Sequence, residues 1–195
     1  MELIYVDGSP FARLVRILIR EWELPVTTRE VPFPLPPDVE TLTPMGQVPL
    51  LLNRGDEPCF PTLRIVDTLL PLVTFENGVP INDRQRALLP VALTAGDALV
   101  QAAYQEWAGL ESNSANALGF DPAARNLGRF NRSVEWLHER VEVLSIVGIT
   151  MAVFLDWARN RAVVGVDLTT AAAGDFLTLT DRPSFRSTVP RPFDR

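Results

Sequence analysis

The chain has 195 residues, 47% of them hydrophobic and 22% charged, with a formal net charge of −6. This length holds one sizeable domain or two small ones, and the composition is typical of a soluble globular protein. The negative charge argues against a nucleic-acid partner, because phosphate binding requires a basic face. We expect no membrane span, since no uninterrupted apolar run approaches ~20 residues, and no signal peptide, since the N-terminus has no basic region.

Side chains with catalytic potential are few. All 18 basic residues are arginine, which excludes mechanisms that depend on lysine, such as Schiff-base formation. The chain has one cysteine, Cys59, and one histidine, His138. An internal disulfide is therefore excluded, and no structural zinc or other metal site is expected. A single cysteine fits a reducing compartment, and we expect the protein to be cytoplasmic.

The first 75 residues alternate short β-type and helical segments. Each predicted strand is a short run of apolar or β-branched residues, and each predicted helix has apolar residues at helical spacing. We predict strands at residues 3–6, 27–33, 47–53 and 58–60, and helices at 10–22 and 62–70. This order, βαβ followed by ββα, indicates a small α/β domain over residues 1–75. Residues 76–83 are predicted to be a linker because they contain proline, glycine and polar residues.

Strand signals largely vanish after the predicted linker. Long stretches with apolar residues at helical spacing follow, and one of them is apolar almost all round, as a buried helix is. Helices are predicted at residues 84–107, 121–144, 146–161 and 169–180, with a loop at 112–120 and a tail from 181 onward. Residues 84–195 are therefore predicted to form an all-α domain.

The stretch GSPFARLVR, residues 8–16, joins the first strand to the first helix. Ser9 is a good N-cap, and Pro10 suits the first helical position. Helix capping alone accounts for a Ser-Pro dipeptide, so this stretch indicates a function only in combination with others. Arg13 and Arg16 are expected to be solvated charges on the helix face; the alternative is that they line the mouth of an active site.

Four stretches together resemble the bacterial glutathione S-transferases, and the resemblance covers nearly the whole chain. They are SPFARLVR at 9–16, TPMGQVPLL at 44–52, FPTLRI at 60–65, and the pair AVFLDWARNR at 152–161 with RPSFRSTVP at 182–190. The resemblance implies a thioredoxin-like N-terminal domain followed by an all-α helical domain.

The resemblance also implies a site for glutathione as co-substrate. The Ser9 hydroxyl is expected to donate a hydrogen bond to the glutathione thiolate, because a donor and positive potential favour the ionised sulfur. Val48, before a cis-proline at Pro49, is expected to pair through its backbone with the cysteinyl part. Thr62, at a helix N-terminus, is expected to hold the γ-glutamyl carboxylate. Phe11 is the remaining predicted glutathione-binding residue.

The chain departs from the family pattern at two positions. Pro61 stands where the family has Asp or Glu, the residue that holds the γ-glutamyl ammonium; Asp97 from the partner of a homodimer is the expected substitute. Gly148 stands where the family has the aspartate of a helix capping box. Ser145 can still cap that helix, but the reciprocal bond is lost, which costs about 1 kcal/mol. The connection into this helix is also shorter than in the family.

Two functions follow as expectations. The first is a cytoplasmic, homodimeric glutathione transferase that adds the glutathione thiolate to a small hydrophobic electrophile. The alternative is a non-catalytic protein of the same fold that binds a ligand or an interaction partner. Ser9, Pro49 and Thr62 favour the enzyme, whereas Pro61 and Gly148 favour the alternative.

Overall fold

The computed structural model describes residues 1–53, 55, 57–74, 79, 81–109 and 119–192. The chain divides into two compact units. The first unit comprises residues 1–79 and 181–195, and the second comprises residues 80–180. Half of the predicted linker at 76–83 and most of the predicted loop at 112–120 lie outside the described residues.

The first unit is built on a three-stranded mixed sheet of order β2-β1-β3. Strands β1 (Glu2–Tyr5) and β2 (Thr27–Glu30) are parallel, and β3 (Leu50–Leu52) is antiparallel to β1. The predicted fourth strand at 58–60 is reduced to a single antiparallel bridge between Leu51 and Cys59. Prolines at 58 and 61 flank this bridge, and because proline has no N–H to donate, the ladder does not extend.

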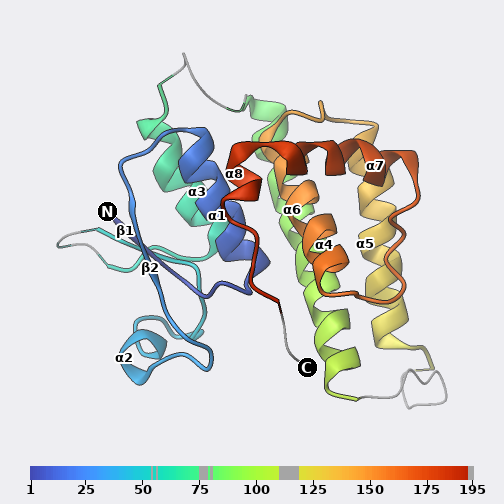
Figure 1. Ribbon diagram of the computed structural model, residues 1–195, viewed down its shortest axis with the longest axis horizontal. Coiled ribbons are helices and arrows are strands. Elements are labelled where there is room, and N and C mark those ends of the chain that lie inside the picture. The colour runs from blue at the N-terminus through green and yellow to red at the C-terminus, as the bar shows by residue number, and fades with distance from the viewer. Residues whose placement is uncertain (54, 56, 75–78, 80, 110–118, 193–195) are drawn as a thin grey trace. The chain divides into compact units, whose positions relative to one another are not determined.

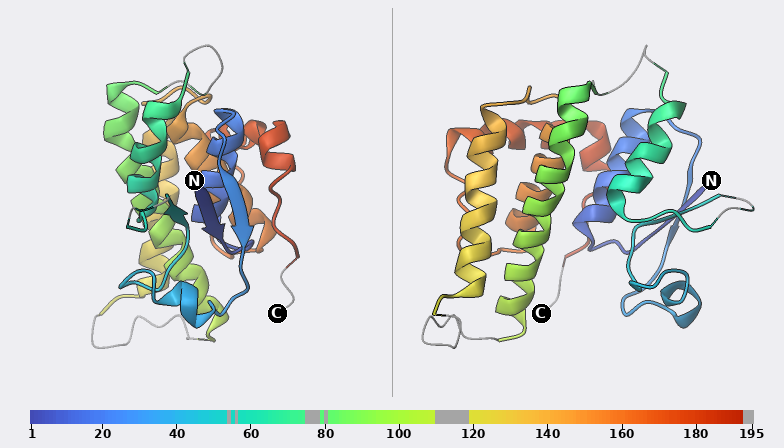
Figure 2. Two further views of the ribbon diagram at one scale, coloured as in Figure 1. Left: turned by 90° about the vertical axis from the view of Figure 1, so that its left-hand side faces the viewer. Right: turned by 180° about the vertical axis from the view of Figure 1, so that it is seen from behind.

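Helices cover both faces of this sheet. Successive side chains of β1 point to opposite faces. Ile4 packs in a core cluster with Val39 of a short helix, α2 (Pro37–Glu40), that the sequence analysis did not predict. The helices α1 (Pro10–Glu21) and α3 (Thr62–Leu69) pack against each other, and a 3-10 turn at Leu70–Leu72 follows α3 (Figure 2).

Residues 181–192, here called the C-terminal strap, return to the first unit. They contain the short helix α8 (Pro183–Arg186), which packs against α1 (Figure 1). The sequence analysis placed these residues in the helical domain as a tail. The reason for the difference is long-range packing: Phe185 is fully buried, and Glu21 at the end of α1 accepts two hydrogen bonds from Arg182.

The second unit is all-helical. Its elements are α4 (Asp83–Trp107), α5 (Pro122–His138), α6 (Ile146–Asn160), α7 (Ala171–Leu177) and a 3-10 turn at Thr178–Asp181. Helix α4 packs against α5 and α6, and α7 packs against α5 and α6. A small mixed-sheet domain and a helical domain were both predicted, and this fold class is confirmed. Helix α5 ends six residues before the predicted end, because residues 139–145 turn the chain into α6.

Helix α4 has the length and apolar composition of a membrane-spanning helix. However, 50% of its most apolar window is buried inside the protein, and the core helix of a soluble protein passes the same test. Among the described residues it is the one helix that passes, which is weak evidence for a membrane span.

The turn into α6 explains the glycine at position 148. Ser145 is the N-cap, and its Oγ accepts a hydrogen bond from the Gly148 N–H at 3.0 Å. In a capping box, a carboxylate would accept a hydrogen bond from the Ser145 N–H. Here that N–H donates to the Val143 carbonyl oxygen at 3.0 Å. A Cβ at position 148 would lie 2.0 Å from that carbonyl oxygen. In this short connection, the Val143 carbonyl accepts the bond that the acidic side chain of a capping box would accept. The carbonyl also occupies the space of a Cβ at position 148, so glycine is required there.

Candidate functional site

Ser9 lies at the N-terminus of α1, directly after the β1–α1 turn. It is the N-cap, and its Oγ accepts a hydrogen bond from the Ala12 N–H at 3.2 Å, while its own N–H donates to the Val6 carbonyl at 3.1 Å. A hydroxyl has one hydrogen to donate and two lone pairs to accept with. Capping therefore uses the oxygen of Ser9 and leaves its O–H able to donate to a ligand. Phe11 lies in the first turn of the same helix and is half-buried.

The Val48–Pro49 peptide bond is cis, as the resemblance implies, and Pro49 is buried immediately before β3. Val48 is half-buried and packs against the core cluster that contains Ile4 and Leu50. No backbone hydrogen bond joins Val48 to another described residue. Its N–H and C=O are therefore able to pair with an extended peptide.

Helix α3 begins at Thr62, whose side chain is buried. Its N-cap is Pro61, which supplies no side-chain hydrogen bond to the first turn. The first N–H groups of a helix have no partner inside the helix, and together with the helix dipole they attract an anion. This helix N-terminus is consequently suited to a carboxylate, with the Thr62 hydroxyl beside it. Proline at 61 offers no charge for an ammonium group.

The topology of the first unit brings these residues to one edge of the sheet. Ser9 follows the carboxyl end of β1. Because β3 runs antiparallel to β1, with Ile4 opposite Leu50, the start of β3 at Pro49 lies at that same edge. The bridge at Cys59 is antiparallel to Leu51, so the chain there runs in the direction of β1 and enters α3 at this edge. Ser9, Val48, Pro49 and Thr62 therefore meet at one edge.

A polar network that the sequence analysis missed lies directly before Ser9. Arg16, which is 7% exposed, donates to Asp7 Oδ1 at 3.3 Å, and its guanidinium lies 4.2 Å from the centroid of the Tyr5 ring. Arg13 is 1% exposed and donates to the Phe185 carbonyl at 3.4 Å. The expectation that both arginines are solvated is therefore wrong, because α1 is covered by the sheet on one side and by the C-terminal strap on the other.

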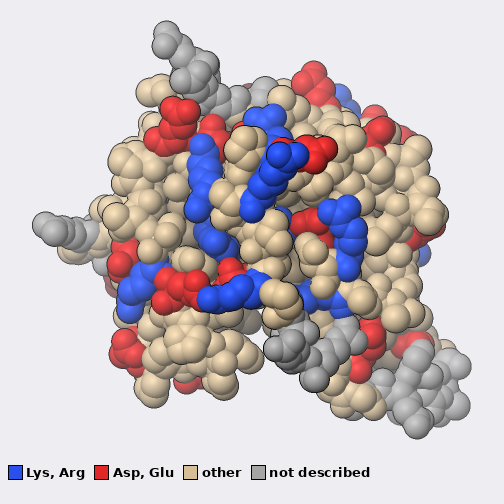
Figure 3. All heavy atoms as spheres, in the orientation of Figure 1, with Lys and Arg blue, Asp and Glu red and all other residues tan. Residues whose placement is uncertain are grey.

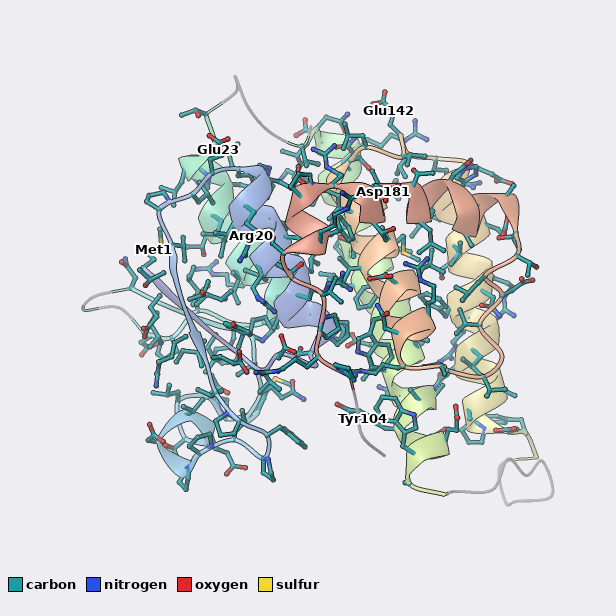
Figure 4. The ribbon with its side chains drawn as sticks, in the orientation of Figure 1. Met1, Arg20, Glu23, Tyr104, Glu142 and Asp181 are labelled. Carbon is teal, nitrogen blue, oxygen red and sulfur yellow. The ribbon has the colours of Figure 1, made fainter. Side chains whose placement is uncertain are left out.

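Figure 3 shows basic and acidic side chains next to one another on the face formed by α1 and the C-terminal strap, where Arg182 pairs with Glu21 and Arg186 with Asp181. Burial alone would raise the pKa of the Glu21 carboxyl, but hydrogen bonds from Arg182 and Ser184 outweigh it and lower that pKa below its ordinary value. Burial, together with the charge of Arg16, lowers the pKa of Arg20. Figure 4 labels Arg20 on α1 and Asp181 at the start of the strap.

Asp97 lies in the second unit, on an open groove between α4 and α5. Val91, Ala95 and Ala98 of α4 form an apolar wall of this groove, and Arg129 of α5 also lines it. Partial burial raises the pKa of the Asp97 carboxyl above its ordinary value. A cation supplied to this groove would therefore stabilise the ionised carboxylate.

Metal ligation has no support among the residues described: no group of three or more His, Cys, Asp or Glu side chains is placed to hold an ion. Cys59 is half-buried, and its Sγ lies 3.3 Å from Thr68 Oγ1. Because the Thr68 hydroxyl donates to the Arg64 carbonyl at 2.9 Å, the thiol is the donor in this contact. Cys59 is thus held by its backbone bridge to Leu51 and by its thiol contact with Thr68, which is a structural role.

Comparison with known proteins identifies the same architecture. The sequence profile of the glutathione S-transferase N-terminal domain matches residues 3–73. No curated protein sequence matches the chain. A glutathione S-transferase from Methylobacillus flagellatus, solved with glutathione bound, superposes with a TM-score of 0.77 at 20% identity, over 97% of this chain and 99% of that one.

Two further bacterial structures are similar. A glutathione S-transferase from Methylobacterium radiotolerans in complex with glutathione sulfonate gives a TM-score of 0.75 at 19% identity, over 100% of this chain and 98% of that one. A glutathione transferase family member from Pseudomonas fluorescens with bound glutathione gives 0.77 at 18% identity, over 97% and 98%. Residues 3–73 thus match the N-terminal domain of the glutathione S-transferases, and the chain has the fold of these solved structures along its length.

Proposed function

We propose that the chain binds glutathione at the sheet edge formed by Ser9, Val48, Pro49 and Thr62 and transfers its thiolate to a small hydrophobic electrophile. The observation that supports this most is the position of Ser9, whose capping bond leaves its O–H available at the N-terminus of α1. The similar structures solved with glutathione or glutathione sulfonate bound support glutathione as the ligand.

The chemistry required of Ser9 is to stabilise an anion. A helix N-terminus carries a partial charge of about +0.5, and a hydroxyl donor adds a charge-assisted hydrogen bond. Both favour the thiolate over the thiol, so the glutathione proton is released to solvent and Ser9 keeps its own. The thiolate then forms a carbon–sulfur bond to the electrophile, which either accepts the electron pair or expels a leaving group.

The remaining groups hold the rest of the tripeptide. The backbone of Val48 pairs with the cysteinyl part, the N-terminus of α3 with Thr62 holds the γ-glutamyl carboxylate, and Phe11 contributes apolar contact. Pro61 leaves the γ-glutamyl ammonium without a carboxylate. We assign that role to Asp97 of the partner in a homodimer, because Asp97 lines the open groove between α4 and α5 and is exposed there to a ligand carried by another protomer.

The alternative, a non-catalytic ligand-binding or interaction protein, is favoured by one observation. Pro61, as the N-cap of α3, contributes no side-chain hydrogen bond where an acidic residue is expected. The two proposals differ in whether glutathione binds and whether its thiol is ionised when bound. We expect a cytoplasmic location for the transferase, because reduced glutathione is its co-substrate.

The test is calorimetric titration of the purified protein with reduced glutathione, combined with the ultraviolet absorbance of the bound thiolate as a function of pH. Thr62→Val keeps the shape of a buried side chain but removes the hydroxyl, and should weaken binding about tenfold. Ser9→Ala should raise the thiol pKa of bound glutathione.

The matched control is Thr170→Ala. Thr170 caps α7 by accepting from the Ala173 N–H at 3.2 Å, so this change removes an equivalent capping bond away from the sheet edge. It should lower stability by about 1 kcal/mol, as Ser9→Ala does, without changing the thiol pKa. Absence of glutathione binding would sink the transferase proposal and leave the ligand-binding alternative. If glutathione binds but Ser9→Ala leaves the thiol pKa of the bound glutathione unchanged, the proposed role of Ser9 is refuted.

A further inference from the structure

The C-terminal strap is fixed at three places, two of them on α1 and the third on the turn before it. At the C-terminal end of α1, Glu21 accepts bonds from Arg182 at 2.9 and 2.6 Å and a short bond from Ser184. In the first turns of α1, Arg13 donates to the Phe185 carbonyl. Before the N-terminus of α1, Asp7 Oδ2 accepts the backbone N–H of Arg191 at 2.7 Å. The strap therefore runs antiparallel to α1 and ends at the turn that carries Ser9.

Asp7 joins three parts of the first unit. Its side chain is 14% exposed, and its two oxygens accept from different elements: Oδ1 from Arg16 of α1 and Oδ2 from Arg191 of the strap. The Arg191 guanidinium in turn bonds to Glu30 at the end of β2, and Glu30 accepts from the Tyr5 hydroxyl at 3.3 Å. Asp7, which precedes Gly8 and Ser9, thus bonds directly to α1 and the strap, and the ends of β1 and β2 are linked to it through Glu30 and Arg191.

We propose that Asp7 is a positioning residue for Ser9, and that the strap acts on the thiolate site through it. The inference rests on the proposed function of Ser9. The β1–α1 turn is closed by the Ser9 N–H to the Val6 carbonyl, and Asp7 lies inside this turn. Its two anchors keep the turn from rotating and therefore fix the position of the Ser9 Oγ, from which the O–H turns to donate.

The hydrogen bond that joins the strap to Asp7 is donated by the backbone N–H of Arg191. A pair of variants at position 191 therefore separates this bond from the contacts of the arginine side chain. Arg191→Pro removes the N–H, and Arg191→Ala keeps it. Both remove the guanidinium and its ion pairs with Glu30 and with Asp7 Oδ2, so these losses are common to the two variants. Residues 190 and 192 are already proline, so the backbone here is extended and tolerates a third proline. The difference between the two variants therefore reports the bond from residue 191 to Asp7.

Two readouts are needed on the full-length chain. The hydrogen-exchange rate of the Ser9 amide measures how firmly the turn is held, without any ligand. The pKa of the thiol of bound glutathione, from thiolate absorbance against pH, measures whether the Ser9 O–H is placed to donate. Relative to Arg191→Ala, we expect Arg191→Pro to raise the exchange rate about tenfold and to raise the thiol pKa.

The proposal is overturned if the two variants exchange the Ser9 amide at the same rate, or if exchange rises while the thiol pKa stays unchanged. A loss of thermal stability alone in Arg191→Pro shows a purely structural strap and also overturns it. If the intact chain binds no glutathione, the proposed function fails and the positioning role fails with it. The exchange rates then still show whether the strap holds the turn.

Discussion

Gly148→Ala tests the account of the turn into α6. Residue 148 is the third residue of this helix, and an exchange of glycine for alanine inside a helix is ordinarily favourable by about 1 kcal/mol. Here the added Cβ would lie 2.0 Å from the Val143 carbonyl oxygen and 2.9 Å from its carbon. Such contacts require the backbone at Val143 to move, because atoms of the main chain cannot rotate away.

The expected magnitude combines three contributions. Forcing an extra carbon into a packed site costs about 1–3 kcal/mol. Moving the Val143 carbonyl weakens the bond that it accepts from the Ser145 N–H, which lies at a fully buried N-cap, at a further cost of about 1 kcal/mol. The helix propensity of alanine offsets about 1 kcal/mol. We therefore expect Gly148→Ala to destabilise the helical unit by about 2 kcal/mol.

Urea unfolding followed by tryptophan fluorescence measures this change, since Trp157 is buried in α6. The matched control is Gly174→Ala in α7, in the same unit, where an added Cβ meets nothing within 4 Å. The control should be neutral or stabilising by up to about 1 kcal/mol. If Gly148→Ala were as stable as Gly174→Ala, the Val143 carbonyl would not be what requires glycine at this position.

Two further predictions concern packing and pH. A Cβ at Gly96 of α4 would lie 2.1 Å from the Phe154 ring, so Gly96→Ala should lower the free energy of unfolding by about 1–3 kcal/mol, as measured in urea. Adding Phe154→Leu to this variant should restore part of the lost stability. Glu21→Gln should cost about 1–2 kcal/mol at neutral pH, because the carboxylate accepts bonds from Arg182 and Ser184. The pKa of Glu21 is lowered in the folded state, so the stability difference between Glu21→Gln and the unchanged protein should be largest above the ordinary glutamate pKa. It should disappear as the pH falls through the lowered pKa. Thermal melting temperatures that differ equally at acidic and neutral pH would contradict this prediction.

Local sequence determined the elements that depend on neighbouring residues. Ser9 and Pro10 specify the start of α1 because an N-cap acceptor and a first-turn proline act within one turn. The apolar run of β1 and the helical spacing of apolar residues in α1, α3, α4 and α6 predicted these elements to within a few residues. The sheet-edge position of Ser9, Pro49 and Thr62 follows from strand order once the strands are known. The roles of these residues stay predictions.

Tertiary structure decided the features that depend on residues far apart in the chain. Glu21 and Arg182 are separated by 161 positions, and Arg13 and Phe185 by 172, so no local pattern indicates that α1 is covered by the strap and that its arginines are buried. The length of α5 was also mispredicted, because the turn that brings the Val143 carbonyl to α6 ends the helix early. Burial and long-range pairing are properties of the folded chain, and they override the local preference of each segment.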